Sequence, residues 1–299
     1  MDNSYSYPLA NIDNWQGYSD EKLRVNGYLR QGHNKGHRVH FLHGTGFSAL
    51  TFATLASHLP QDWRLWLTDV PGHGMSQQPN HRMPDWRAMA SMVANVVYRQ
   101  ANVEQDGPII GIGHSMGGVL TLLAAAKYPK LFSRVVLLDP VLFKPELMVA
   151  QHLMRASGAW KHSALVRSVS KRRAIWPDKE AMFKYLSEKP FYKPWHPQVL
   201  ADFVNSATKS NDSNEIQLAC DPRWEGSIFG SYPRGLWHAV RKVGIPVDIL
   251  VATKSYGFIP GAVKKASKIN GDSKMFRVGE ANRASHRLSK TYLQKKLKT

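Results

Sequence analysis

Cysteine is almost absent from this chain, and long apolar runs are missing altogether. Cys220 is the only cysteine in 299 residues, which excludes a disulfide framework within the chain, and no Cys/His cluster suggests a metal site. No stretch approaches the roughly 18 apolar residues that a membrane-spanning helix needs. The first residues, MDNSYSYPLANIDNW, have neither the basic nor the apolar region of a secretory signal. We therefore expect a soluble, cytoplasmic protein without a bound metal.

Acidic residues are scarce relative to basic ones. The chain has 22 Asp and Glu against 40 Lys and Arg, and residues 241–299 alone hold 14 basic and 3 acidic side chains. Such an excess can attract nucleic acid or acidic lipid. No zinc-finger, RNP or basic-heptad pattern accompanies the charge, so a specific nucleic-acid partner is not expected. The basic C-terminal part is interpreted as a solvated face, with peripheral contact to an anionic membrane as the weaker alternative.

The sequence does have the material for a large core. Apolar residues make up 43% of it, with nine Trp, eleven Tyr and eleven Phe. Short apolar runs alternate with longer segments of helical period, which is typical of βαβ units and a mostly parallel, twisted sheet flanked by helices. A helix is expected from Trp86 onward, with Asp85 as its N-cap. The expected strands span residues 38–42, 64–68, 108–112, 135–138, 247–252 and 275–278.

This alternation stops between residues 141 and 235. That region has several tryptophans and scattered prolines, with helix-like pieces but no convincing core strand. The pattern predicts a core made of residues 1–140 and 236–299, with a largely helical cap at 141–235 inserted between two strands. The cap's aromatic residues indicate an apolar substrate pocket, although most of them should form the cap's own core. Those considered are Trp160, Trp176, Trp195, Trp224, Phe183, Phe191 and Phe229.

A serine stands between glycines in the stretch GIGHSMGG at residues 111–118. An apolar run precedes it and a long helical run follows, so Gly113 and Gly117 permit a tight strand-to-helix turn. Such a turn exposes the Ser115 hydroxyl at the carboxyl edge of the sheet, beside the backbone N–H groups of a helix start. Ser115 is therefore predicted to be a nucleophile. The alternative is a serine that merely caps the helix.

Three stretches together resemble the α/β-hydrolase family in order and spacing. They are HFLHGTGFSALTF at 40–52, WLTDVPGHGMS at 66–76 and GIGHSMGGVL at 111–120. The resemblance covers residues 1 to about 140 and 236–299, and the insertion then lies after the sixth strand, where the family has its lid. It implies the α/β-hydrolase fold and a cofactor-free esterase, lipase or lactonase.

The resemblance also implies roles for residues around Ser115. The oxyanion hole is expected from the backbone N–H groups of Met116 and Thr45, with Gly46 as the second choice for the latter. His286 follows the last expected strand, where the family keeps its general base. The other candidates are His43 and His73, expected to be structural, and His114, expected to point away from the serine hydroxyl.

The acid of the expected triad departs from the usual family pattern, because the usual position holds no carboxylate. The segment PVDILVATKSYGFIP has none after its strand, and Asp248 lies near the wrong end. Asp139 ends the strand that follows the Ser115 helix, some family members place the acid there, and it is the preferred candidate. The alternatives are Glu280, or no acid with Ser255 or Tyr256 orienting the base. Asp139 can also simply cap the segment that begins at Pro140.

These residues predict a serine hydrolase that cleaves a carboxylic ester or lactone through an acyl-enzyme. The expected partner is a small, apolar, ester-type substrate, and no cofactor is expected. The main alternative is a non-catalytic binding protein that keeps the pocket. Acyltransferases, C–C bond hydrolases and cofactor-free haloperoxidases share the same constellation. The oligomeric state is not indicated.

Overall fold

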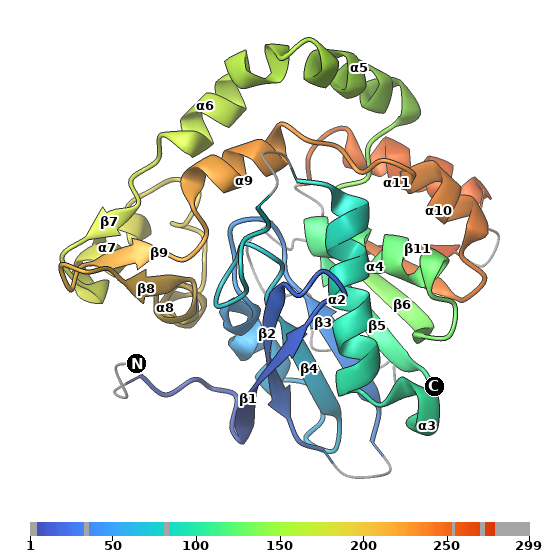
Figure 1. Cartoon of the computed structure of the whole chain (residues 1–299), viewed down its shortest axis with the longest axis horizontal. Coiled ribbons are helices and arrows are strands. Elements are labelled where there is room, and N and C mark those ends of the chain that lie inside the picture. The colour runs from blue at the N-terminus through green and yellow to red at the C-terminus, as the bar shows by residue number, and fades with distance from the viewer. Residues whose placement is uncertain (1–4, 33–35, 81–83, 253–254, 270–272, 279–299) are drawn as a thin grey trace.

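A twisted sheet runs through the centre of the molecule (Figure 1). The computed structural model describes residues 5–32, 36–80, 84–252, 255–269 and 273–278. In this part of the chain the main sheet has eight strands in the order β1-β2-β4-β3-β5-β6-β10-β11. β2 is antiparallel to β1 and β4, and all other neighbours are parallel, so the predicted mostly parallel sheet is confirmed. The strands are β1 (Ile12–Tyr18), β2 (Arg24–Arg30), β3 (Arg38–Leu42), β4 (Arg64–Thr68), β5 (Ile109–His114), β6 (Phe132–Leu138), β10 (Val247–Ala252) and β11 (Ser273–Val278).

The central strands are apolar because helices cover both faces of the sheet. Alternate residues of β3 point to opposite faces, so Phe41 belongs to one buried cluster and Leu42 to the other. On the face of Leu42 pack α2 (Trp86–Gln100), α4 (Met116–Lys127), α10 (Leu236–Lys242) and α11 (Ile259–Ile269). On the face of Phe41 pack η1 (Ala49–Phe52) and α1 (Ala53–Ser57), and the short helix α3 (Val103–Asp106) precedes β5.

The helix expected at Trp86 starts at that residue. The carboxylate of Asp85 accepts hydrogen bonds from the backbone N–H groups of Arg87 (2.9 Å) and Ala88 (3.4 Å), so the predicted N-cap is confirmed. Asp85 also forms an ion pair with Arg234, just before α10. The start of α2 is therefore tied to the segment where the chain re-enters the core.

Between β6 and β10 the chain leaves the main sheet. It forms α5 (Pro145–Ala156), η2 (Ala159–His162), α6 (Ala164–Ser170), α7 (Lys179–Ser187), α8 (Pro197–Ser206) and α9 (Pro222–Phe229). A small antiparallel sheet, not predicted from the sequence, joins β7 (Ile175–Trp176), β9 (Ile216–Leu218) and β8 (Thr208–Ser210). We call residues 141–235 the cap, and the division of the chain at its ends stays a prediction.

The cap has a hydrophobic cluster of its own, built around Trp176, Met182 and Phe203. In Figure 1, α5 and α6 form an arch along the outer rim of the molecule, and α9 runs beneath them toward the core. None of the helices in the described residues is both long and apolar enough to cross a membrane.

Candidate active site

Ser115 lies in a strained turn between β5 and α4. Its backbone has φ 53° and ψ −118°, a conformation that costs a non-glycine residue about 1–3 kcal/mol. The surrounding chain holds it there: the Ser115 N–H donates to the Leu138 carbonyl (3.0 Å), and the Val141 N–H donates to the Ser115 carbonyl (3.3 Å). Ser115 is at the N-cap position of α4, yet its side chain makes no capping hydrogen bond. The capping interpretation is therefore not supported.

The two glycines of the turn are required by close backbone contacts. A Cβ at Gly113 would lie 2.5 Å from the Gly117 carbonyl oxygen, so the collision expected inside the turn is present. A Cβ at Gly117 would lie 2.3 Å from the carbonyl oxygens of both Leu42 and His43. Gly117 is thus needed because the end of β3 crosses the helix start at van der Waals distance, a contact between segments far apart in sequence.

The loop after β3 reaches the same place. Thr45 and Gly46 line one cavity together with Ser115, and the Thr45 hydroxyl donates to the Met116 sulfur at 3.3 Å. Gly46 has φ 80°, in the left-handed region that favours glycine. The structure therefore brings together the residues expected to form an oxyanion hole, and that role stays a prediction.

Asp139 follows β6 and lines the same cavity. It is 6% exposed and has φ 44°, a second non-glycine residue in the left-handed region. Its N–H donates to the Leu250 carbonyl (2.7 Å), and its Oδ1 accepts a hydrogen bond from the Ala252 N–H (3.3 Å). The next helix, α5, has Lys144 as its N-cap, so Asp139 does not cap it.

Ser115 and Asp139 are brought together by the sheet register. His114 pairs with Leu138 in the parallel ladder of β5 and β6, so each of the two residues is one step past a paired position. The carboxyl ends of adjacent parallel strands lie at the same edge of the sheet. A common edge for the two residues was predicted from the sequence, and the geometry agrees.

The remaining candidates from the sequence fall into three groups: undescribed, buried away from the cavity, or beside it. His286 and Glu280 are outside the described residues. Asp248 is buried and accepts a hydrogen bond from Arg134 Nε at 2.6 Å, which satisfies it away from the cavity. Tyr256 lines the cavity, whereas the adjacent Ser255 does not.

The early histidines have structural hydrogen bonds. His43 Nδ1 donates to the Gly44 carbonyl (2.7 Å) and Nε2 accepts from the Val70 N–H (2.9 Å), which requires the neutral ring. Burial lowers the pKa of His43 well below its usual value and lowers the pKa of His73 to about 4. Both residues match the structural role expected for them.

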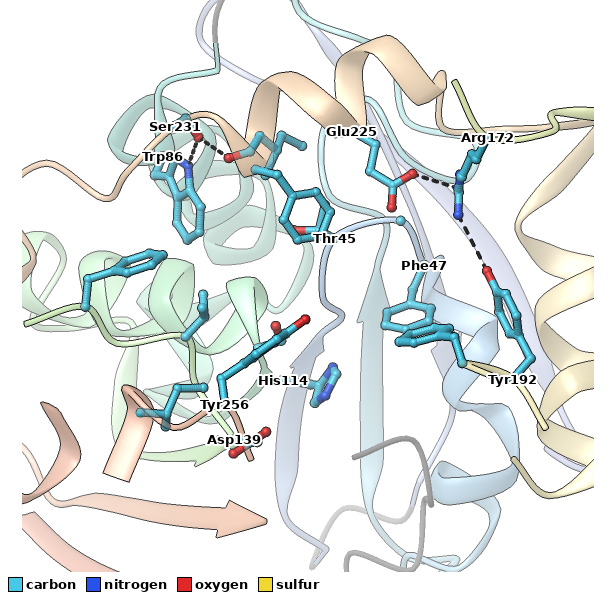
Figure 2. Close-up of a pocket in the computed structure, with 18 of the residues that line it drawn as sticks. Thr45, Phe47, Trp86, His114, Asp139, Arg172, Tyr192, Glu225, Ser231 and Tyr256 are labelled. Carbon is cyan, nitrogen blue, oxygen red and sulfur yellow. Dashed lines mark hydrogen bonds and ion pairs between the residues drawn. The ribbon is translucent and has the colours of Figure 1, made fainter. Parts of the chain in front are cut away.

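His114 belongs to the cavity wall, which was not predicted. Its ring packs on Phe47 and Phe52, with centroid separations of 6.0 and 5.4 Å. The cavity has a volume of about 170 Å³, and eight aromatic side chains line it (Figure 2). Three of the cap aromatics considered from the sequence, Trp195, Phe191 and Phe229, line it. Trp176 and Phe183 belong to the cap's own core and do not line the cavity, and Trp195 belongs to both. The aromatic lining residues are Phe47, Trp86, Phe143, Phe191, Tyr192, Trp195, Phe229 and Tyr256.

A buried ion pair from the cap completes the wall, and nothing in the sequence pattern pointed to it. Arg172 Nη2 lies 2.7 Å from Glu225 Oε2, and Arg172 Nη1 donates to the Tyr192 hydroxyl at 3.5 Å (Figure 2). Burial raises the pKa of the Glu225 carboxyl, with Arg172 opposing that rise. Burial lowers the pKa of Arg172, but Glu225, Tyr192 and Cys220 together outweigh that effect and raise the pKa, so the guanidinium stays charged.

The ion pair rests on the loop after β3. A Cβ at Gly46 would lie 2.4 Å from Glu225 Oε1, so only a glycine fits beneath the carboxylate. Among the described residues, no group of three or more His, Cys, Asp or Glu side chains is arranged to hold a metal ion.

The sheet order and the serine between strand and helix define an α/β-hydrolase. The model of the alpha/beta hydrolase family matches residues 41–292, so the chain belongs to that family. This confirms the resemblance seen in the three sequence stretches.

Curated relatives match over about a third of their own length. A serine hydrolase-like protein of Danio rerio is 41% identical over 116 residues, covering 38% of this chain and 34% of that protein. The monoglyceride lipase of Mus musculus is 35% identical over 106 residues, or 35% of each chain. These names support a hydrolase.

Solved structures match over nearly the whole chain. An E-2-(acetamidomethylene)succinate hydrolase has a TM-score of 0.72 at 22% identity, covering 96% of this chain and 97% of its own. A thioesterase domain from the curacin biosynthetic pathway has a TM-score of 0.72 at 16% identity, covering 96% and 99%. At such identities the likeness shows the fold alone.

Proposed function

We propose that this α/β-hydrolase cleaves carboxylic esters or lactones through a serine acyl-enzyme. The observation that carries the proposal is Ser115 itself. Its strained backbone is held by two neighbouring segments, its hydroxyl caps nothing, and it lines a cavity shared with Thr45 and Asp139. Backbone strain at a residue that faces a cavity is typical of a functional position. The lipase and hydrolase names among the relatives are consistent with this activity.

In the proposed reaction the Ser115 Oγ attacks the substrate carbonyl carbon while His286 takes its proton. The backbone N–H groups of Thr45 and Met116 hold the carbonyl oxygen as it becomes negative. Each N–H group lowers the activation barrier by about 2.7–4 kcal/mol. His286 then returns the proton to the leaving alcohol. Water, activated by the same histidine, hydrolyses the acyl-enzyme and releases the acid and the free serine.

Asp139 is proposed to orient His286. The Asp139 carboxylate lies at the ends of β6 and β10, and β10 pairs with β11 as far as Val278. Three strand spacings of about 4.8 Å separate β5 from β11, roughly 14 Å in all, and the eight residues from Val278 to His286 can span up to roughly 26 Å. The chain is therefore long enough for His286 to reach both Ser115 and Asp139.

The walls of the cavity support a small, apolar substrate. Eight aromatic side chains line a space of about 170 Å³, and the only charged groups among the lining residues are Asp139 and the paired Arg172 and Glu225. Such a wall excludes water from the reacting carbonyl and favours an apolar acyl or alcohol group. The cytoplasm remains the proposed compartment, consistent with a single cysteine that is buried and unpaired.

Hydrolysis of short p-nitrophenyl esters tests the proposal. Wild type should turn over a short-chain ester, and Ser115→Ala should lose about a thousandfold or more in kcat/KM with an unchanged melting temperature. Ser168→Ala, at an exposed serine outside the cavity, is the matched control and should retain full activity. If wild type and Ser115→Ala are equally inactive toward every ester and lactone tried, the non-catalytic binding protein is favoured instead.

A further inference from the structure

The helix α5 exposes apolar side chains that a helix of its length normally buries. None of its 12 residues is buried, and Val149, Leu153 and Met154 are 61%, 62% and 41% exposed. Val149 and Leu153 are four residues apart and therefore share one face of the helix. In α6, Leu165 is also 51% exposed. We call α5, η2 and α6 (residues 145–170) the cap ridge, which forms the outer rim of the molecule in Figure 1.

Basic residues are frequent along this segment of the chain. Exposed cations lie before, within and after the ridge, at Lys144, Lys161, Arg167 and Lys171. The only acidic residue between positions 144 and 173 is Glu146, and its carboxylate lies 3.6 Å from Lys265 Nζ of α11. The ridge thus combines solvent-facing apolar side chains with cations and has no unpaired acid among its described residues.

We propose that the cap ridge docks on an anionic lipid surface. Exposed apolar side chains flanked by Lys and Arg are the combination with which helices bind the membrane interface: the apolar groups enter the acyl boundary and the cations meet the headgroups. A second copy of this chain fits poorly, because two ridges with the same cations would repel each other on a chain of net charge +18. Charge complementarity therefore favours an anionic surface as the occupant.

Docking in this way would bring the substrate cavity close to the lipid. Val166 of α6 is buried, and Gly226 of α9 lies so near it that a Cβ there would be 3.2 Å from the Val166 carbonyl oxygen. The same helix α9 supplies Glu225, Ile228 and Phe229 to the cavity wall. One layer of helix therefore separates the ridge from the cavity. An apolar ester held in the membrane would then lie close to the cavity.

Vesicle sedimentation of the full chain tests the docking. The Ser115→Ala variant is used, so that the result does not depend on the proposed hydrolase activity. It should bind phosphatidylcholine vesicles that contain phosphatidylglycerol at least tenfold more tightly than vesicles of phosphatidylcholine alone, and added salt should weaken that binding. Equal binding to both vesicles, or binding to neither, overturns the proposal.

Variants of the ridge separate its two components. Val149→Glu/Leu153→Glu should lower vesicle binding at least tenfold, and Lys161→Glu/Arg167→Glu should lower it by about fivefold or more per residue. The matched control is Tyr18→Glu/Lys130→Glu, which changes an equally exposed aromatic residue and a surface cation away from the ridge and should bind normally.

The same variants must stay folded and active for the result to count. Melting temperature and hydrolysis of a water-soluble ester should be unchanged in an otherwise wild-type background, because none of the four ridge residues lines the cavity. If the ridge variants bind vesicles as well as the control does, the proposal is wrong. It is also wrong if light scattering shows a wild-type dimer that Val149→Glu/Leu153→Glu dissociates, since the ridge would then contact a second copy.

Discussion

The sheet edge that carries Ser115 and the cap that covers it are packed very differently. Ser115 and Asp139 both have positive φ, and each is held by hydrogen bonds from neighbouring strands. In the cap, by contrast, α5 has no buried residue. The difference indicates that the two regions have different roles. The core fixes the geometry of the proposed chemistry, and the cap supplies walls of the cavity and its outer surface.

One ion pair within the cap lies against the core, and a second joins the cap to the core. Arg172 and Glu225 of the cap lie over the loop of Gly46, and Arg234 pairs with Asp85 at the start of α2. Substitutions in the sheet edge should therefore change activity most, and substitutions in the connecting pairs should change mainly stability.

The largest effect is expected at Asp139. Asp139→Asn should lower kcat/KM by about a thousandfold or more, because an amide cannot stabilise the protonated imidazole of His286. Asp248→Asn is the control: it removes a buried carboxylate from the other end of the sheet and should cost stability while leaving turnover intact. Near-normal turnover in Asp139→Asn would remove Asp139 from the proposed triad. Glu280, or no acid with Ser255 or Tyr256 orienting the base, would then remain.

The buried ion pair in the cap should have the next largest effect. Arg172→Met leaves Glu225 buried without its partner and should lower the free energy of unfolding by about 3 kcal/mol. Arg172→Met/Glu225→Met should recover most of that loss, because no charge remains buried. Urea denaturation of the three proteins checks this, and equal stability of wild type and Arg172→Met would show that the pair does not hold the cap on the core.

Acid should weaken the core through its buried histidines. Burial lowers the pKa of His40 to about 3 and of His73 to about 4, so the folded state binds fewer protons than the unfolded state below pH 6.5. Stability is then present above pH 6.5 and is lost as the pH falls toward those values. For His40 the loss between pH 6.5 and pH 5 is roughly 2 kcal/mol.

Asp69 acts in the opposite direction. Burial raises its pKa to about 6, so the folded state binds an extra proton between pH 6 and the ordinary aspartate value, which partly offsets the histidines. Urea denaturation at pH 7 and pH 5 measures the balance. His40→Gln can keep the hydrogen bond to Thr68 but does not titrate. It should therefore lose less unfolding free energy between pH 7 and pH 5 than wild type does. An unchanged slope in His40→Gln would contradict this account.

The smallest effect is expected at the cap of α2. Asp85→Ala removes the bonds to two backbone N–H groups and the exposed pair with Arg234, and should cost about 1 kcal/mol of unfolding free energy. Asp85→Asn retains a capping oxygen and is the control. If both variants lose the same stability, the contact with Arg234 matters more than the N-cap.

Much of the sheet was predictable because its central strands are buried on both faces. β3, β4 and β10 begin and end at the predicted residues, since each is a short, mainly apolar run that ends in a polar or glycine-rich loop. β1 and β2 were not predicted. β1 lies at the edge of the sheet with most of its side chains at least partly exposed, and it carries Asp13, Asn14 and Gln16 instead of an apolar run. The cap strands have only two or three residues, too few for a period to show.

Some residues of the candidate site could be predicted from the sequence, and others could not. Ser115 and Asp139 were predicted because each stands at the end of a recognisable strand, and parallel topology gathers such ends at one edge. Thr45 was predicted from the resemblance to the α/β-hydrolase family. Arg172 lies in the bend after α6 and Glu225 lies in α9, 53 positions further on. Neither stands in a local motif, and only the folded cap brings them together. The aromatic wall was expected in kind, but which aromatic residues face the cavity depends on packing that no local pattern encodes.

Labelling by a fluorophosphonate probe, with the modified residue located by mass spectrometry, tests the central claim most directly. The probe reacts only with a serine whose hydroxyl is activated by a base. The phosphoryl oxygen of the probe must also be held by an oxyanion hole. The account predicts labelling of wild type at Ser115 and none in Ser115→Ala. Folded wild-type protein that stays unlabelled, or a Ser115→Ala variant labelled as strongly as wild type, would contradict it.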